Sequence, residues 1–521
     1  MSPVRNAPIG ASELAMNDRI LVMHPDDSVA IALQAIAVNE LINEQLRALD
    51  DIPAGHKIAV RSADKGDFVR KYGHVIGVAT GPIRTGEHVH AHNLHYAGEA
   101  PTDASASTSG ARDSGMTSSG APTFNGYRRP DGQVGTRNYV GVMATVNCSA
   151  TVVSRIARHF ETPGLLASSG VDGVVAVTHQ SGCGIPASGG VELSVLQRVL
   201  RGYLHHPNFC GWLVVGLGCE VNQVSELIAA EPAAGPPIRT LNIQDAGGTR
   251  AAIDSGISLV NELIAASSGL MRVQAPLSAL RLGLQCGGSD GWSGVTANPA
   301  LGNAVDRVVM AGGAAILAET PEIHGAEQLL KNRAVDAAVA DRLQSKVDWW
   351  HDYLARHGQD VSGNPSPGNL AGGITTILEK SLGAVAKSGS VPLSGVLDYA
   401  EAPRDAGLWF MDSPGYDPCS VTGEVAAGAN LVCFTTGRGS TFGATGAPTV
   451  KIASNSALFA RMRDDMDIDC GGIAHGEDTI EAAGERIFRT IVDVASGEQT
   501  NSERHGLGTF EFVPWSQGAM V

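Results

Sequence analysis

The chain has 521 residues, of which 43% are hydrophobic and 17% are charged, and its formal net charge is −16. This length exceeds one ordinary core, so we expect two to four domains. The acidic balance argues against a nucleic-acid partner, because phosphate binding needs a clustered basic surface. Apolar runs stay short of the ~20 residues that a membrane span requires, and no signal peptide is recognisable. We therefore expect a cytoplasmic protein without a membrane partner.

The eight cysteines are spread along the chain without a C-x-x-C pair. A secreted disulfide framework would be denser, so reduced thiols are expected. No Walker A loop and no G-x-G-x-x-G motif occurs, which counts against nucleotide and dinucleotide chemistry.

Residues 1–96 read as a small module with short β-type runs at residues 19–23, 57–60, 75–79 and 87–92. A helical pattern at residues 28–49 is expected to interrupt these strands. Residues 97–123 are rich in Ser, Thr, Gly and Ala and poor in apolar side chains, which predicts a flexible linker.

Beyond that segment, apolar strand-like runs alternate with helical patterns. The expected strands lie at residues 138–145, 173–178, 212–216, 240–242, 280–284, 314–318, 407–411 and 430–435. Two expected helices lie at residues 150–160 and 189–204. This alternation is typical of parallel sheets with crossover helices. The sequence therefore predicts an α/β fold with two parallel-sheet subdomains, residues 124–272 and 273–521.

Three histidines, His88, His90 and His92, alternate within the expected strand at residues 87–92. Alternation on a strand places all three on one face, where neutral imidazoles bind a transition metal. His24 lies at the end of an earlier strand of the same module. The alternative interpretation is a solvated edge strand with incidental histidines.

Thiols follow three of the expected strands. His179 and Cys183 follow the expected strand at residues 173–178. Cys219 and Glu220 follow the one at residues 212–216, and Cys286 follows the one at residues 280–284. Ligands of open α/β sheets bind outside the carboxyl ends of the strands, so these groups are candidates to converge. The alternative is that cysteine is small and is commonly buried at tight strand–helix contacts.

The glycine-rich turn at residues 285–299 contains Ser289 and Asp290, and its backbone N–H groups suit an anion. It also matches G-x-S-x-G, the nucleophile elbow of serine hydrolases, although no clean helix follows it directly. Arg438 and Lys451 add a basic, glycine-flanked group that can bind a carboxylate.

Long segments resemble the altronate/galactarate dehydratase family. They are residues 126–129, 135–138, 179–184, 216–220, 286–299, 364–369 and 435–438. The resemblance implies that the N-terminal module is a SAF (β-clip) domain, marked here by Gly55-His56-Lys57 and Lys71-Tyr72-Gly73. It also implies removal of water from a sugar acid with help from Fe²⁺ or Mn²⁺. Residues 86–93 look like the altronate branch, whereas the usual Asp-Asn-Val reads Asp27-Ser28-Val29.

The dehydration needs a base at C2, a cation beside the carboxylate and an acid for the departing C3 hydroxyl. We expect the site between the N-terminal module and the large region. The catalytic candidates are His56, Lys57, His179, Glu220 and Asp290. The substrate-binding candidates are Ser289, Asn298, Asn369, Arg438 and Lys451. The metal candidates are His24, His88, His90 and His92, with an iron–sulfur cluster on Cys183, Cys219 and Cys286 as the rival.

D-altronate is the expected substrate. Galactarate or another aldonate or aldarate is the alternative, followed by a serine hydrolase that uses Ser289 and by a non-catalytic sugar-acid binder. We expect a homodimer.

Overall fold

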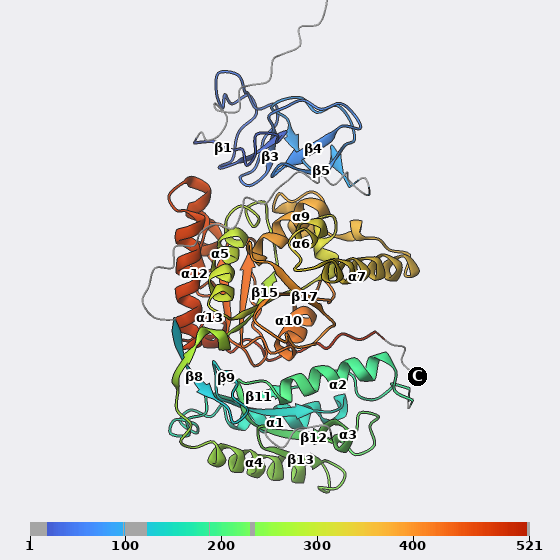
Figure 1. The fold of residues 1–521 in the computed structure, drawn as a ribbon, viewed down its shortest axis with the longest axis vertical. Coiled ribbons are helices and arrows are strands. Elements are labelled where there is room, and N and C mark those ends of the chain that lie inside the picture. Colours follow the sequence, from blue (N-terminus) through green and yellow to red (C-terminus); the bar gives the residue numbers. More distant parts are fainter. Residues whose placement is uncertain (1–17, 97, 99–121, 187, 230–234, 518–521) are drawn as a thin grey trace, which may run out of the picture.

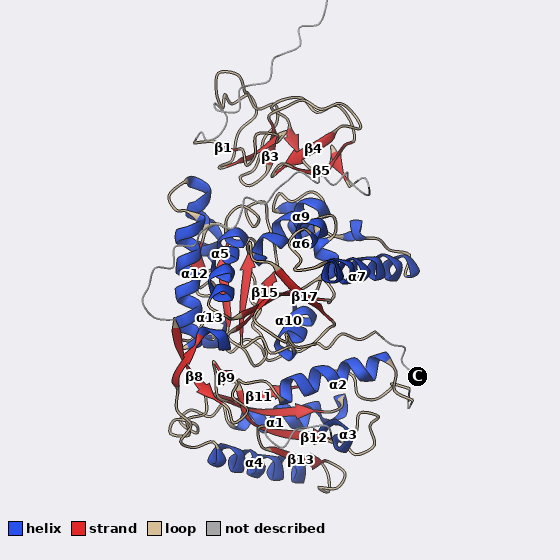
Figure 2. Ribbon diagram, viewed as in Figure 1, coloured by secondary structure: helices blue, strands red, loops and turns tan. Residues whose placement is uncertain are grey.

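The computed structural model describes residues 18–96, 98, 122–186, 188–229 and 235–517. The predicted linker at residues 97–123 therefore lies almost entirely outside the described residues. Three domains follow one another, and the third lies between the other two (Figure 1). Figure 2 shows that the N-terminal domain consists of strands and loops, whereas helices accompany the strands of the two others. Within the described part of the chain, no helix is long and apolar enough to cross a membrane.

The N-terminal domain contains two small antiparallel sheets with the orders β1-β2-β3-β6 and β4-β5-β7. The strands are β1 Ile20–Leu21, β2 Val29–Ala32, β3 Lys57–Ala59, β4 Phe68–Lys71, β5 His74–Ala79, β6 His88–Val89 and β7 Leu94–His95. Two small apolar clusters form their cores. The predicted strand at residues 87–92 is limited to β6, so only His88 of the three histidines lies on a strand.

The helix predicted at residues 28–49 is wrong. All four residues of β2 are buried, because this strand pairs with β1 on one side and with β3 on the other. The chain then turns repeatedly: Asn39 adopts a φ of 66°, and the Asn43 side chain accepts the Leu46 backbone N–H at 2.8 Å. Asparagine side chains compete with helical hydrogen bonds in this way, so the apolar spacing here reflects turns.

The second domain has a parallel sheet in the order β11-β10-β12-β13, as the alternating pattern predicts. Its strands are β10 Tyr139–Ala144, β11 Gly173–Val177, β12 Phe209–Gly216 and β13 Ile238–Asn242. Its helices are α1 Ala150–His159, α2 Val191–Leu204, α3 Val224–Ile228 and α4 Thr249–Ala266. β11 lies on one side of β10, and the next strand, β12, lies on the other side. The strand order therefore reverses between β10 and β12.

The third domain has a seven-stranded parallel sheet in the order β17-β18-β16-β15-β19-β20-β21. The strands are β15 Arg281–Cys286, β16 Ala314–Leu317, β17 Leu393–Leu397, β18 Gly407–Met411, β19 Leu431–Thr436, β20 Thr449–Ala453 and β21 Ile468–Asp469. The helices are α5 Ala297–Met310, α6 Glu327–Lys331, α7 Ala337–Arg356, α8 Pro367–Ala371, α9 Ile377–Val385, α10 Asp417–Ala426, α11 Ser456–Arg461, α12 Ile480–Ala495 and α13 Asn501–Arg504. Here the strand order reverses between β15 and β19.

A short antiparallel sheet joins the second and third domains. It has the order β14-β8-β9, with β8 Thr123–Arg128, β9 Val134–Gly135 and β14 Val273–Pro276. The predicted boundary at residues 272–273 falls at the start of β14. Helix α2 packs on α10 so closely that a Cβ at Gly202 would lie 2.2 Å from the Ala426 carbonyl oxygen. The two domains therefore share an apolar core.

Candidate functional site

A thiol and two carboxylates meet at the carboxyl edge of the third sheet. Cys286 ends β15, and Glu319 follows β16 with a φ of 72°, at the start of a short 3₁₀ helix, Thr320–Ile323. The ligand atoms of Cys286, Glu319 and Glu322 lie within 4.8 Å of one another, and all three residues are buried. Among the described residues, no other group of three such ligands is this compact. We call this set the thiol–carboxylate cluster.

Further buried charge surrounds the thiol–carboxylate cluster. Burial raises the pKa of Asp417 to about 6 and that of Glu424 to about 8. One carboxylate oxygen of Glu322 and one of Glu424 are buried without a hydrogen-bond partner. Burial opposes the charge on Lys387, but Cys286 and Glu319 outweigh it and raise the lysine pKa. Buried carboxylate oxygens that lack a hydrogen-bond partner, close to a thiol, fit a bound cation, because such oxygens are costly to bury.

A second buried charge cluster joins the N-terminal domain to the third domain. Glu379 of α9 accepts hydrogen bonds from Lys57 at 2.8 Å and from Lys71 at 2.8 Å. The three side chains are at most 3% exposed. Burial raises the pKa of the Glu379 carboxyl, but the two ammonium groups outweigh it and hold that pKa well below its usual range. We call this set the lysine–glutamate triad.

The lysines of the triad differ. Burial lowers the pKa of Lys57 to about 8, and the attraction of Glu379 offsets this only in part. For Lys71 the same burial is outweighed by Glu379, which raises the lysine pKa. One carboxylate cannot balance two ammonium groups, so Lys57 is the lysine that is ready to lose its proton near neutral pH.

The predicted histidines form a ring cluster beside the triad. The Nδ1 of His56 lies 3.1 Å from the Nε2 of His88, and the ring centroids of His88 lie 5.4 Å from those of His90 and 5.6 Å from those of His92. Burial lowers the pKa of His56 to about 4 and that of His88 to about 3. The imidazoles of His56 and His88 are therefore neutral at pH 7. His24 does not contact them in this arrangement and lies against Gly73 and Asp26.

The histidine cluster faces the third domain. The Nε2 of His90 lies 2.9 Å from the Leu370 carbonyl oxygen, and the Nε2 of His56 lies 3.4 Å from that of Ala371. Lys57 also donates to the Gly373 carbonyl at 2.6 Å. A Cβ on Gly55 would lie 2.8 Å from the Trp292 indole nitrogen, so the turn at Gly55 needs glycine. The domains therefore dock closely where sequence analysis expects the site.

Helix α9 connects the two charged clusters. Glu379 belongs to the lysine–glutamate triad, and the next residue, Lys380, donates to the Glu322 carboxylate at 2.6 Å. Successive residues of a helix point in directions about 100° apart, so one turn serves both clusters. Lys387 lies in the 3₁₀ helix Ala386–Ser388 that follows directly.

The predicted residues of the glycine-rich turn are well satisfied. Asp290 is buried and its oxygens accept from Ser293 Oγ at 2.8 Å, Ser454 Oγ at 2.8 Å and Asn455 Nδ2 at 3.0 Å. Burial raises its pKa in spite of these bonds. The Ser289 carbonyl accepts from the Asn369 side chain at 2.9 Å. No histidine of the described chain hydrogen-bonds to Ser289, so the serine-hydrolase alternative has no base here.

The remaining substrate-binding candidates differ in accessibility. Asn298 is buried and bridges the Gly383 carbonyl and Thr435 Oγ1. Lys451 is buried in β20 and donates to the Ser440 carbonyl at 3.1 Å. Arg438 is exposed in the loop after β19, beside the turn that contains Ser289. Of these, the Arg438 side chain is the one that solvent reaches.

The second domain holds the other predicted residues, so the structure does not bring them to this site. His179 is buried, with Nε2 at 3.0 Å from the Ala144 carbonyl, and burial lowers its pKa to about 4. Glu220 accepts from Thr145 Oγ1 and from the Gly218 N–H, both at 2.7 Å. Cys183 and Cys219 lie on the same loops and are exposed, whereas Cys286 is buried in the third domain. The predicted cluster of these three cysteines is therefore not assembled.

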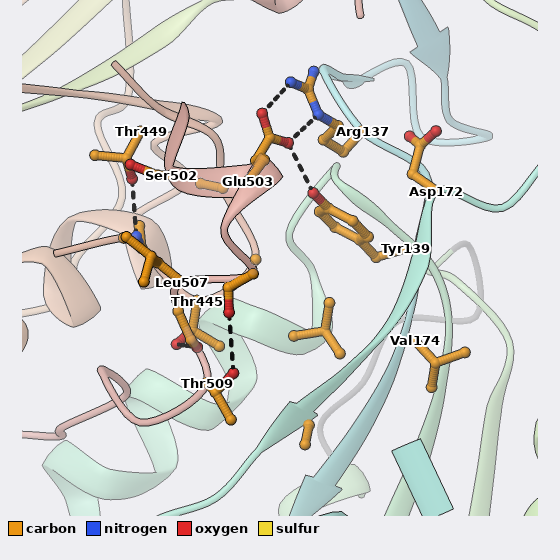
Figure 3. Close-up of a pocket in the computed structure, with 18 of the residues that line it drawn as sticks. Arg137, Tyr139, Asp172, Val174, Thr445, Thr449, Ser502, Glu503, Leu507 and Thr509 are labelled. Carbon is orange, nitrogen blue, oxygen red and sulfur yellow. Dashed lines mark hydrogen bonds and ion pairs between the residues drawn. The ribbon is translucent and has the colours of Figure 1, made fainter. Parts of the chain in front are cut away.

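A cavity of about 460 Å³ lies between the second and third domains (Figure 3). Three of its polar side chains bond to one another: Arg137 donates to both carboxylate oxygens of Glu503 at 2.6 and 2.7 Å, and the Tyr139 hydroxyl donates to the same carboxylate at 3.2 Å. The thiol–carboxylate cluster and the lysine–glutamate triad do not line it. This cavity has room for a ligand, but Arg137, Tyr139 and Glu503 are already hydrogen-bonded to one another.

Sequence reasoning missed several functional groups of this site. Glu319 and Glu322 follow a correctly predicted strand, so the rule that ligands bind beyond strand ends would have found them. Lys71 belongs to the Lys71-Tyr72-Gly73 motif, but the sequence around it does not indicate that its partner is Glu379. Glu379 and Lys380 lie on an ordinary helix, and only the fold shows which charges they meet.

Comparisons with known proteins cover nearly the whole chain. Three family models match: the altronate/galactarate dehydratase SAF domain at residues 18–97, the D-galactarate dehydratase/altronate hydrolase second domain at 126–268, and the D-galactarate/altronate dehydratase C-terminal domain at 277–520. Altronate dehydratase of Bacillus subtilis is 35% identical over 93% of this chain and 96% of its own length. Galactarate dehydratase (L-threo-forming) of Escherichia coli is 35% identical over 93% of this chain and 94% of its own.

A two-subunit relative is also similar. The β subunit of (2R)-sulfolactate sulfo-lyase from Chromohalobacter salexigens is 32% identical over 75% of this chain and 96% of its own length. The α subunit of the same enzyme is 46% identical over 50 residues, which are 10% of this chain and 53% of that subunit.

We predict that Glu379→Gln weakens docking of the N-terminal domain. The substitution leaves Lys57 and Lys71 buried without a counter-charge, and breaking a buried ion pair costs about 3–5 kcal/mol. Hydrogen exchange should become faster in β3 and β4, and the thermal midpoint should fall. The control is Glu262→Gln, because Glu262 pairs with Arg239 on the surface. Equal exchange and equal midpoints for both variants would contradict the prediction.

Proposed function

We propose that this chain, which belongs to the altronate/galactarate dehydratase family, removes water from D-altronate to give a 2-keto-3-deoxy acid. Membership of a dehydratase family makes it a hydro-lyase that acts on a sugar acid. The similarity to altronate dehydratase over the whole chain is the observation that carries the proposal. The histidine-bearing segment at residues 86–93 supports the altronate branch.

The docked interface contains the groups that this reaction needs. The C2 proton of an aldonate is weakly acidic, so its removal needs a base whose pKa lies near the working pH. Lys57, with a pKa of about 8, and the neutral His56 are the candidates. Lys71 keeps its charge and is suited to holding the carboxylate of the substrate or its developing negative charge. Once it has taken the C2 proton, the same base carries a proton that it can donate to the departing C3 hydroxyl.

The thiol–carboxylate cluster is the favoured holder of a divalent metal. Cys286, Glu319 and Glu322 bring three ligand atoms together, whereas His90 is occupied by the Leu370 carbonyl. A thiolate with carboxylates suits Fe²⁺ better than Mn²⁺, because sulfur is the softer donor. When bound, the metal supplies Lewis-acid stabilisation of the substrate carboxylate.

We infer that the N-terminal domain completes the site. Lys57, Lys71 and the histidines come from that domain, and the acids and Cys286 come from the third. The two-subunit relative supports this division, because its α and β subunits match a short part and a long part of this chain. In that relative, two chains would have to meet where this chain folds back on itself.

The substrate assignment predicts turnover of D-altronate in an anaerobic screen of aldonates and aldarates with added Fe²⁺ or Mn²⁺. The measurement is formation of the 2-keto-3-deoxy product. Lys57→Met serves as the matched inactive enzyme, because it removes the base and keeps a long side chain. Turnover of galactarate alone would assign the chain to the galactarate branch. No keto-acid product from any member of the panel would refute the proposed function.

The metal assignment predicts that Glu322→Gln weakens Mn²⁺ binding by at least about tenfold, because a ligand is lost. The number of bound ions can be followed by the loss of the free Mn²⁺ signal in electron paramagnetic resonance. Glu424→Gln is the control, since Glu424 is buried nearby but lies outside the three-ligand group. If His90→Ala abolishes binding and Glu322→Gln does not, the metal belongs to the histidines.

The two-domain site predicts complementation in trans. Residues 122–521 expressed alone should be inactive, and addition of residues 1–97 should restore part of the turnover. The same fragment with Lys57→Met should dock but restore nothing. Full activity of residues 122–521 alone would show that the N-terminal domain is dispensable for the chemistry.

A further inference from the structure

Three thiols are exposed at one edge of the second domain. Cys148, Cys183 and Cys219 are exposed, whereas the other five cysteines of the chain are buried. Each follows the carboxyl end of a parallel strand, β10, β11 and β12 respectively, and these three strands are neighbours in the sheet. Cysteine is usually a buried residue, so three exposed thiols at one edge call for a specific role.

This edge is where an open α/β sheet binds its ligands. The strand order reverses between β10 and β12, and the loops after these two strands carry Cys148 and Cys219. Crevices at such reversals are the general ligand-binding position of this architecture. The corresponding reversal in the third domain lies between β15 and β19, next to Cys286. The two sheets therefore place a thiol at the same topological position.

Hydrogen bonds tie the three cysteine-bearing loops together. The Asn147 N–H donates to the Ser181 carbonyl at 3.0 Å, which joins the loops of Cys148 and Cys183. The Val221 N–H donates to the Gly182 carbonyl at 3.1 Å, which joins the loops of Cys183 and Cys219. A Cβ on Gly182 would lie 2.2 Å from the Thr145 carbonyl oxygen, so glycine is needed for this approach. The three cysteine-bearing loops are thus held together as one platform by backbone hydrogen bonds.

The buried polar residues beneath the platform point inward. The His179 side chain bonds to the Ala144 carbonyl, and the Glu220 carboxylate accepts from Thr145 Oγ1 and the Gly218 N–H. Both side chains therefore bond to the loops that carry them. They hold the loops in place, and the exposed side chains that remain able to bind a ligand are the three thiols. The Gln244 side-chain amide donates to the Cys219 sulfur at 3.7 Å. Cys148 lies in the 3₁₀ helix Asn147–Ser149, which leads into α1.

The three thiols do not form a compact single-ion site in the described part of the chain. Ligands of one ion must approach one another closely, and these three sulfur atoms do not form a group within 4.8 Å in the described chain. A cubane iron–sulfur cluster holds its cysteine ligands farther apart, because each sulfur binds a different iron. We propose that Cys148, Cys183 and Cys219 bind a cubane iron–sulfur cluster whose fourth iron takes a ligand from solution. Each thiol releases its proton as its sulfur binds iron, and the core is assembled from two ferrous ions, two ferric ions and four sulfides, so no further oxidant is consumed.

The test is anaerobic reconstitution of the full-length protein with ferrous iron, ferric iron and sulfide, followed by desalting. We expect about four acid-labile sulfides and at least about four iron ions per chain, with broad visible absorption. Cys148→Ser, Cys183→Ser and Cys219→Ser should each lose most of the sulfide and the iron bound with it. Cys286→Ser is the matched control and should keep the sulfide, because its thiol lies in the third domain, and it should lose only the single ion proposed for the thiol–carboxylate cluster. These readouts need no substrate, so they are independent of the proposed dehydration.

Other outcomes would overturn the cluster. Wild-type protein that retains no sulfide, or that binds zinc in place of iron and sulfide, would exclude it. A cluster that survives Cys148→Ser but is lost in Cys286→Ser would move it to another set of thiols. Circular dichroism of each variant checks that the second domain is folded, and a folded Cys→Ser variant with a full complement of sulfide would also overturn the assignment.

Discussion

The contact on which the arrangement of the domains depends is the buried Glu379 carboxylate between Lys57 and Lys71. Burying three charges is costly, and their mutual attraction compensates only when the geometry is good. Glu379 meets that condition, because Thr375 supplies two further hydrogen bonds, from its N–H at 2.9 Å and its hydroxyl at 2.8 Å. A misplaced N-terminal domain would leave these charges unpaired. The triad therefore selects one docked arrangement, and it leaves a net positive charge where a sugar acid would bring a negative one.

Helix α9 links this contact to the thiol–carboxylate cluster. Its residue Glu379 fixes the N-terminal domain, while Lys380 contacts the thiol–carboxylate cluster through Glu322. A shift of α9 by a fraction of a turn would disturb both clusters together. The second domain has no such link to the site. Its polar residues brace its own sheet edge, and it meets the third domain through an apolar core and the Arg137–Glu503 ion pair.

The fold of the two larger domains could be predicted from the sequence because their strands are nearly continuous apolar runs. The expected strand at residues 407–411 coincides with β18, and the expected helix at residues 150–160 differs from α1 by one residue at its end. The N-terminal domain was harder, because Asn39 and Asn43 turn the chain where apolar spacing resembles a helix. The grouping of His88, His90 and His92 was expected from their spacing, although only His88 lies on a strand. Glu379 could not be predicted, because its lysine partners lie about three hundred residues away and only docking brings them together. Lys380 could not be predicted either, because its partner Glu322 is 58 residues away and only the fold of the third domain brings the two together.

The N-terminal domain and the surface that it docks on belong to one chain, and this has a consequence for mass action. Docking within a chain is a unimolecular equilibrium, governed by an effective concentration that reaches millimolar values for short flexible connections. Dilution of the protein therefore does not separate the lysines from Glu379. If the same two surfaces were carried on separate chains, they would meet only through a bimolecular association, whose extent would depend on the concentration of both. Covalent linkage therefore frees this interface from the need for high affinity.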